Sequence, residues 1–313
     1  MRNTTEVLRR GLDSTLANWQ LIAIRIAESL LFVLIIIASI FAAIVPVVVA
    51  AGLSHLDLKS AENPAEIFAA IVVEHWMLIL YLLAIVTVLL GVLIAVHSFV
   101  EAGNAKIFVD AERGAARVGA PQRDSFRAFS MDRWMMGGRS SWWSVFWIYN
   151  ITWGIGGLVI VVPLLAAIAG MLMIDEPAGK VVMGCAGLLI ALILGIPLFI
   201  IIAVWTQKAI AVCVARAQSA NPALRDGWSE IRGDFSRHFA VAFIVFVIAF
   251  GGAAVISMFT APMSMLRGAT HTPAFLDIAF APAQILTSIL QSFFSAAVGL
   301  WFLASYVGLT EER

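Results

Sequence analysis

The sequence predicts an all-α polytopic membrane protein with six transmembrane helices, arranged as three repeated helical hairpins with cytoplasmic interfacial helices. Its composition is 61% hydrophobic and 13% charged, with a mean hydropathy of +0.96, whereas soluble domains carry about 25% charged residues. Six apolar runs each reach the length of about 20 residues that a membrane-spanning helix requires. These runs cover residues 21–51, 75–99, 142–174, 181–204, 239–265 and 275–303.

The first apolar run follows Arg9 and Arg10, a pattern that also occurs in secretory signals. The hydrophobic region of a signal is about 7–15 residues long, and this run is about twice that length. We therefore expect it to be retained as the first span.

Lys and Arg are distributed unevenly between the two sides of the six spans. Seventeen of the 20 lie on the side that carries both termini, and the other side has only Lys59, Lys180 and Arg267. The positive-inside rule then predicts cytoplasmic N and C termini. Helical spans favour the bacterial inner membrane, because outer-membrane proteins are usually barrels. The net charge of zero does not indicate a nucleic-acid-binding protein.

An internal repeat connects the first and last thirds of the chain. Residues 8–12 (Leu-Arg-Arg-Gly-Leu) match residues 224–228 (Leu-Arg-Asp-Gly-Trp) at an offset of 216. The same offset pairs Trp19 with Phe235 and Pro46 with Pro262. Such self-similarity is typical of one supersecondary unit that has been copied and packed against itself.

A weaker middle copy places residues 128–130 on residues 227–229, and Pro163 on Pro262. Each unit is interpreted as a cytoplasmic amphipathic helix, an ascending span with an outer proline and a descending span. The sequence thus predicts a single integral membrane domain over residues 1–313, with repeat units of approximately 1–115, 116–218 and 219–313.

These motifs, together with the closing residues 304–309 (Ala-Ser-Tyr-Val-Gly-Leu), resemble a loosely defined group of six-span bacterial membrane domains. The group includes the membrane domain attached to some glycerophosphodiester phosphodiesterases and related families of unknown function. The resemblance implies the membrane fold alone. The phosphodiesterase is a separate soluble domain in that group, and no catalytic residue is transferred to this chain.

The sixth span carries a row of polar residues, Gln284, Ser288, Gln291 and Ser295, at spacings that place them on one helical face. Polar groups facing lipid are costly, so we expect this face to point into the helix bundle or a water-filled cavity. Hydrogen bonding between helices is one interpretation and a ligand pathway is the other.

A second candidate site lies early in the third span, where aromatic residues are dense. Trp143 and Trp147 are typical of an interfacial aromatic belt. Together with Arg139 and Asn150 they could also form a pocket for a lipid headgroup.

Function is predicted from these features as that of a non-catalytic integral inner-membrane protein, a scaffold or accessory subunit of envelope or lipid-related machinery. The alternative is a transporter or lipid-handling protein that uses the polar face of the sixth span. Membrane lipids and other membrane proteins are the expected partners. No catalytic residue, metal site or cofactor is predicted, because the chain contains no HExxH motif, paired-cysteine motif or phosphate loop.

Overall fold

The computed structural model describes residues 2–53, 76–118, 121–174, 176–258 and 274–312. Within these ranges the chain forms α-helices, one short 3-10 helix and no strand. Six of the helices are long and apolar enough to cross a membrane. The predicted all-α class with six candidate spans is therefore confirmed.

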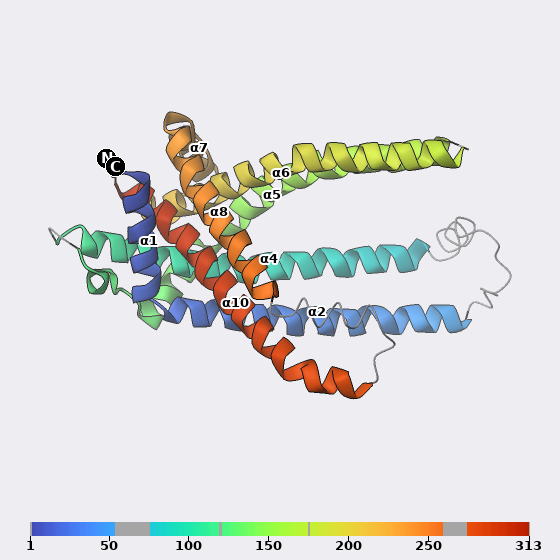
Figure 1. Cartoon of the computed structure of the whole chain (residues 1–313), viewed down its shortest axis with the longest axis horizontal. Coiled ribbons are helices and arrows are strands. Elements are labelled where there is room, and N and C mark those ends of the chain that lie inside the picture. The colour runs from blue at the N-terminus through green and yellow to red at the C-terminus, as the bar shows by residue number, and fades with distance from the viewer. Residues whose placement is uncertain (1, 54–75, 119–120, 175, 259–273, 313) are drawn as a thin grey trace. The chain divides into compact units, whose positions relative to one another are not determined.

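The helices follow one another in the order that Figure 1 shows. Their bounds are Thr4–Ala17 for α1, Gln20–Leu53 for α2, Trp76–Ala115 for α4, Met131–Met173 for α5, Pro177–Arg216 for α6, Ala220–Gly233 for α7, Phe235–Met258 for α8 and Ala274–Glu311 for α10, with the 3-10 helix η1 at Arg123–Phe126.

Local sequence signals account for several of these ends. The Asn3 side chain accepts a hydrogen bond from the Glu6 N–H at 2.7 Å and so caps α1. Ser130 caps α5 in the same way. Pro177 begins α6 at a position where its missing N–H costs no helical bond. The helix ends at Arg216, and the residue that follows, Ala217, adopts a left-handed conformation (φ 52°) that closes it.

The described chain divides into two compact units. One is the hairpin Ala27–His97, formed by most of α2 and the first half of α4. Glu28 lies 2.8 Å from His97 in this hairpin, and the Tyr81 hydroxyl donates to the Ala42 carbonyl at 3.4 Å. These two pairs fix an antiparallel register. The other unit combines Met1–Ile26 with Ser98–Arg313.

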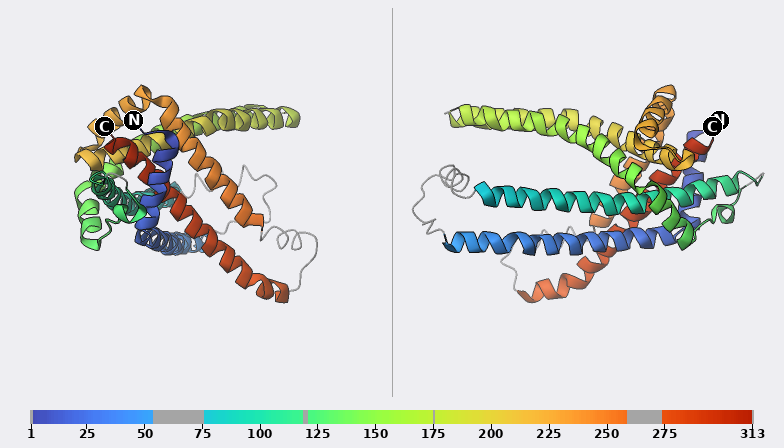
Figure 2. Two further views of the ribbon diagram at one scale, coloured as in Figure 1. Left: turned by 60° about the vertical axis from the view of Figure 1, so that its left-hand side comes forward. Right: turned by 180° about the vertical axis from the view of Figure 1, so that it is seen from behind.

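Within the larger unit, α5 and α6 form a long antiparallel hairpin. Both views of Figure 2 show the two helices side by side. Glycines permit the close approach: Gly156 faces Ile202 near the inner end, and Gly187 faces Ala167 further out. Small residues at such positions let the backbones of membrane helices approach closely. Gly154 and Gly157, by contrast, have open space beside them.

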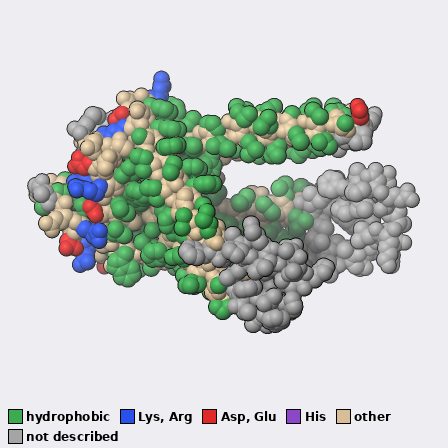
Figure 3. All heavy atoms as spheres, viewed as in Figure 1, with side chains coloured by type: hydrophobic (Ala, Val, Ile, Leu, Met, Phe, Trp, Pro, Cys, Tyr) green, Lys and Arg blue, Asp and Glu red, His purple; other side chains and the backbone are tan. Residues whose placement is uncertain are grey.

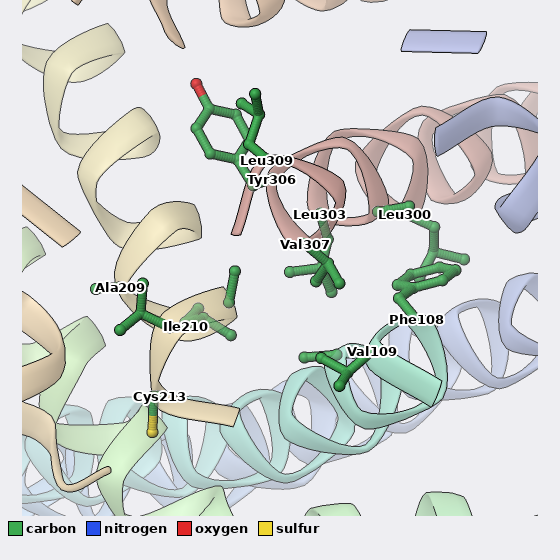
Figure 4. Packing of buried hydrophobic residues seen from close by; sticks show 14 of the residues in the cluster. Phe108, Val109, Ala209, Ile210, Cys213, Leu300, Leu303, Tyr306, Val307 and Leu309 are labelled. Carbon is green, nitrogen blue, oxygen red and sulfur yellow. The ribbon is translucent and has the colours of Figure 1, made fainter. Parts of the chain in front are cut away.

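The core of the larger unit forms where the last turns of α4, α6 and α10 meet. Phe108, Ile210, Leu303 and Val307 from these helices are almost fully buried and gather in one cluster (Figure 4). All three helices thus continue well beyond an apolar span. Visible charged side chains concentrate at the end of the molecule that carries both termini (Figure 3).

Two amphipathic helices attach to this core by the same contacts. The Trp301 indole of α10 donates to the Leu8 carbonyl of α1 at 2.8 Å, and Gly11 packs against the backbone of Ser305. The contacts of α7 on α6 are equivalent: Trp205 donates to the Leu224 carbonyl at 3.0 Å, and a Cβ on Gly227 would lie 3.2 Å from the backbone of Ala209. Residues 8–12 and 224–228 share the pattern Leu-x-x-Gly followed by a bulky residue, which we call the Leu-x-x-Gly-bulky motif. It is therefore a docking motif in which glycine allows helix-to-helix contact.

The middle segment differs from the prediction of a third amphipathic helix. Only Arg123–Phe126 form a helical turn, and the chain then runs extended to Ser130. The buried Asn18 side chain accepts hydrogen bonds from the N–H groups of Ala128 and Phe129, each at 2.9 Å. Because these backbone groups bond to Asn18, they cannot join a helical ladder. In this unit the close glycine contact is made by α5 itself: Gly137 packs against Ala102 and Lys106 of α4.

Candidate functional site

The predicted polar face of the sixth span lies on α10, but most of it is not covered by the rest of the larger unit. Gln284 is half-buried, whereas Ser288, Gln291 and Ser295 are exposed. The expectation that this face points into the helix bundle or a cavity is not met by Ser288 and Gln291 in the larger unit, whereas Ser295 lines the cavity described next. Continuous burial of α10 begins only near Leu300, where the helix enters the core.

A lateral cavity lies where this polar face meets the core, between α6, α8 and α10. Its volume is about 300 Å³, and Phe199, Phe246 and Phe302 form part of its wall. Ser295 is the single polar residue among its lining residues, all of which the structure describes. The lining is suited to a hydrocarbon chain, because its walls are formed almost entirely by apolar and aromatic side chains.

A second apolar cavity of about 380 Å³ adjoins the first. The two share Phe199, Ile200 and Phe246, and the second extends along α5 to Leu164. All of these residues belong to candidate spans. The two cavities together therefore form an apolar groove among the candidate spans.

The two predicted headgroup tryptophans line a separate hollow between α5 and the start of α7. This hollow has a volume of about 350 Å³, and its wall combines Trp143 and Trp147 with polar side chains at Ser144, Ser219 and Asn221. Trp143 is 54% exposed and Trp147 is 45% exposed, so their ring faces are accessible. A hollow with an aromatic and a polar side is suited to the interfacial region of a lipid.

The other two predicted headgroup contacts lie outside this hollow. Arg139 is exposed, and it precedes Trp143 by four residues on the same helical face. The Asn150 amide donates to the Phe146 carbonyl at 2.8 Å, so this hydrogen bond ties it to its own helix. The structure thus brings Trp143 and Trp147 together in one hollow and leaves Asn150 to a local role.

A set of buried ion pairs surrounds the core and was not predicted from the sequence. Lys208 of α6 is completely buried; its Nζ lies 2.8 Å from Glu230 of α7 and donates to the Thr310 hydroxyl of α10 at 2.9 Å. Arg216 reaches the other carboxylate oxygen of Glu230 at 2.5 Å. One lysine therefore links the consecutive helices α6 and α7 to α10, which lies about 100 residues away in the sequence.

Two similar pairs fix α4. Arg10 of α1 lies 2.8 Å from Glu112, and the Arg25 guanidinium of α2 lies 3.0 Å from Glu101. Both glutamates are about 98% buried or more. A charge buried in this way requires a partner, so the presence of Glu101, Glu112 and Lys208 beside apolar runs was the sequence signal that these pairs exist. The partners of Glu101 and Glu112 were not recognisable, because more than 70 residues separate each of them from its arginine.

Two carboxyl groups outside the candidate spans have altered acidities. Burial alone would raise the pKa of Glu230, but the hydrogen bonds and charges of Lys208 and Arg216 outweigh it and leave the pKa lowered. Burial likewise opposes the lowered pKa of Glu312, whose carboxylate accepts from the Arg2 N–H and pairs with Arg237 at 2.5 Å. Both groups are therefore held in their charged forms, which indicates a structural role in joining the chain ends to the core.

Among the described residues, no cluster of three or more His, Cys, Asp or Glu side chains has the geometry of a metal site. Comparison of the chain with protein-family models, with curated proteins and with solved structures finds no match.

Proposed function

We propose that this chain is a non-catalytic integral membrane protein that acts as a scaffold or accessory subunit of envelope or lipid-related machinery. The observation that carries the proposal is the use of its buried charges. Lys208, Glu230 and Glu112 all join helices to one another, and the resulting core holds the ends of three long helices together. Such a core provides a fixed platform, while the long apolar helices present surface to lipids and to other membrane proteins.

The proposed location is the bacterial inner membrane, with both termini in the cytoplasm. The 17 Lys and Arg on the side of the termini support this orientation. Exposed aromatic residues at the ends of the two amphipathic helices agree with it: Trp19 is 60% exposed and Phe235 is 51% exposed. These two residues occupy equivalent positions at the offset of 216, and aromatic residues are enriched at membrane interfaces, which supports the proposed orientation.

The proposed architecture is a threefold internal repeat that closes on itself. The first amphipathic helix docks on α10, the α7 helix docks on α6, and the start of α5 docks on α4. Each unit thus contacts the descending helix of the unit before it, and the first contacts that of the last. This cyclic order supports descent from one copied hairpin.

Purification of the tagged chain in native lipid discs tests the scaffold role, with proteins and lipids identified by mass spectrometry. We expect one or a few membrane proteins in constant proportion to the chain. A matched sample with Trp19→Ala and Phe235→Ala should stay folded but recover less of them if the interfacial helices position the complex. Reproducible recovery of a single lipid species without a protein would contradict the scaffold and favour lipid handling.

The lateral groove favours lipid handling as the second candidate function. Gly299 lines the 300 Å³ cavity and has open space beside its Cα, so Gly299→Leu should fill the cavity without a backbone clash. Gly251 also has open space but does not line the cavity, and Gly251→Leu is the matched control. Loss of a co-purified lipid in the first variant alone would support lipid handling. Equal lipid content in both variants would exclude this cavity as the binding site.

A further inference from the structure

The polar residues of α10 follow the spacing of a left-handed helix-packing seam. Gln284, Ser288, Gln291 and Ser295 are separated by four, three and four residues, which is the alternation of the d and a positions of a heptad. We call these four residues the α10 seam. Membrane helices often pack at the shallow left-handed angle that this alternation produces.

The central amide of this seam has no hydrogen-bond partner within the described residues of the larger unit. Gln291 is exposed, and its side chain makes no hydrogen bond to any described residue. Its neighbours Ile289 and Leu290 are exposed apolar residues of a candidate span, so the surroundings of the amide are those of the membrane. An amide without a hydrogen bond in hydrocarbon costs several kcal/mol. A polar occupant of this face would remove that cost.

A second copy of this chain fits the seam better than an unrelated helix. Two copies inserted with the same orientation place their α10 helices parallel, so each residue of the seam meets the same residue of the other copy across a twofold axis. Carboxamides both donate and accept hydrogen bonds, so two Gln291 side chains satisfy each other. The small side chains of Ser288 and Ser295 allow the two backbones to approach closely. The seam carries no charge that would need a complementary charged partner.

We propose that the protein forms a parallel homodimer in the membrane through the α10 seam, with reciprocal hydrogen bonds between the two Gln291 amides. The arrangement goes beyond the proposed scaffold role, which requires no self-association. It also gives an account of why this face is polar although the larger unit leaves most of it exposed.

Cysteine cross-linking in native membranes tests the dimer. The exposed Cys185 is replaced by Ala, and Cys213 is kept because it is buried. Ser288→Cys should then form a covalent dimer on mild oxidation. Leu290→Cys lies at nearly the same depth on the opposite side of the helix and is the matched control. Equal cross-linking at both positions, or none at Ser288→Cys, would overturn the proposal.

The role of the amide is tested by a second change in the Ser288→Cys background. Gln291→Leu should weaken dimerisation by about tenfold, because the two reciprocal hydrogen bonds between the amides are lost. Gln291→Asn keeps the amide and should retain most of the cross-link. An unchanged thermal unfolding midpoint would show that both variants fold. A cross-linked product with the mass of this chain plus a different protein, or unchanged dimer in Gln291→Leu, would refute the assignment.

Discussion

Removal of Glu230 should destabilise the chain more than removal of Lys208, although the two residues form one ion pair. Lys208 is completely buried and its Nζ lies 2.8 Å from Glu230. Breaking such a pair by removing one partner costs about 3–5 kcal/mol when a charge stays buried without compensation. We expect Glu230→Gln to fall in this range, because Lys208 then keeps its charge in the core and loses this carboxylate.

Lys208→Met should cost less, about 2 kcal/mol at most. Glu230 keeps its pair with Arg216 at 2.5 Å in this variant, and methionine fills a similar volume without a charge. The double variant Lys208→Met/Glu230→Gln should be no less stable than Glu230→Gln alone, because no lysine charge then remains in the core. The single costs should therefore not add.

The free energies can be measured by denaturant titration in mixed micelles with tryptophan fluorescence as the signal. The ring centroids of Trp205 in α6 and Trp228 in α7 are 5.5 Å apart. Emission from these two rings therefore reports separation of the helices that the ion pair joins. Additive costs, or a larger cost for Lys208→Met than for Glu230→Gln, would refute the reasoning.

Three further predictions concern topology, acidity and packing. A cysteine introduced at Ala178 should react with an impermeant reagent applied to intact cells, whereas one at Ala116 should not, because 17 of 20 Lys and Arg place the termini inside; labelling at Ala116 would reverse the orientation. The lowered pKa of Glu230 means that its stabilising contribution is present above the usual glutamate pKa of about 4.3 and is lost as the pH falls through the lower folded value. Acid titration of Glu230→Gln should therefore show a flatter loss of stability than that of the natural chain, and parallel curves would contradict this account. Gly227→Ala should cost about 1–3 kcal/mol, because its Cβ would press on the α6 backbone at 3.2 Å. Gly251→Ala, which meets open space, should be neutral or slightly stabilising, and equal costs for the two would count against close docking of α7.

The sequence by itself determined the class of this protein and the positions of its spans. Apolar run length is a local property, because every backbone group in a membrane helix is bonded within its own segment. The Leu-x-x-Gly-bulky match at residues 8–12 and 224–228 also indicated two similar helices before any contact was known. Pro262, which belongs to the same match, lies outside the described residues.

Only the tertiary structure decided which residues meet at the core and which face of α10 is covered. Lys208 and Thr310 are 102 residues apart, and no local pattern records that they share a hydrogen bond. The missing third amphipathic helix has the same origin, since the distant Asn18 side chain binds the backbone of Ala128 and Phe129. Spacing along α10 correctly placed Gln291 and its neighbours on one face, but spacing carries no information about what lies beside a helix. Periodicity is set by one helix, whereas burial depends on its neighbours.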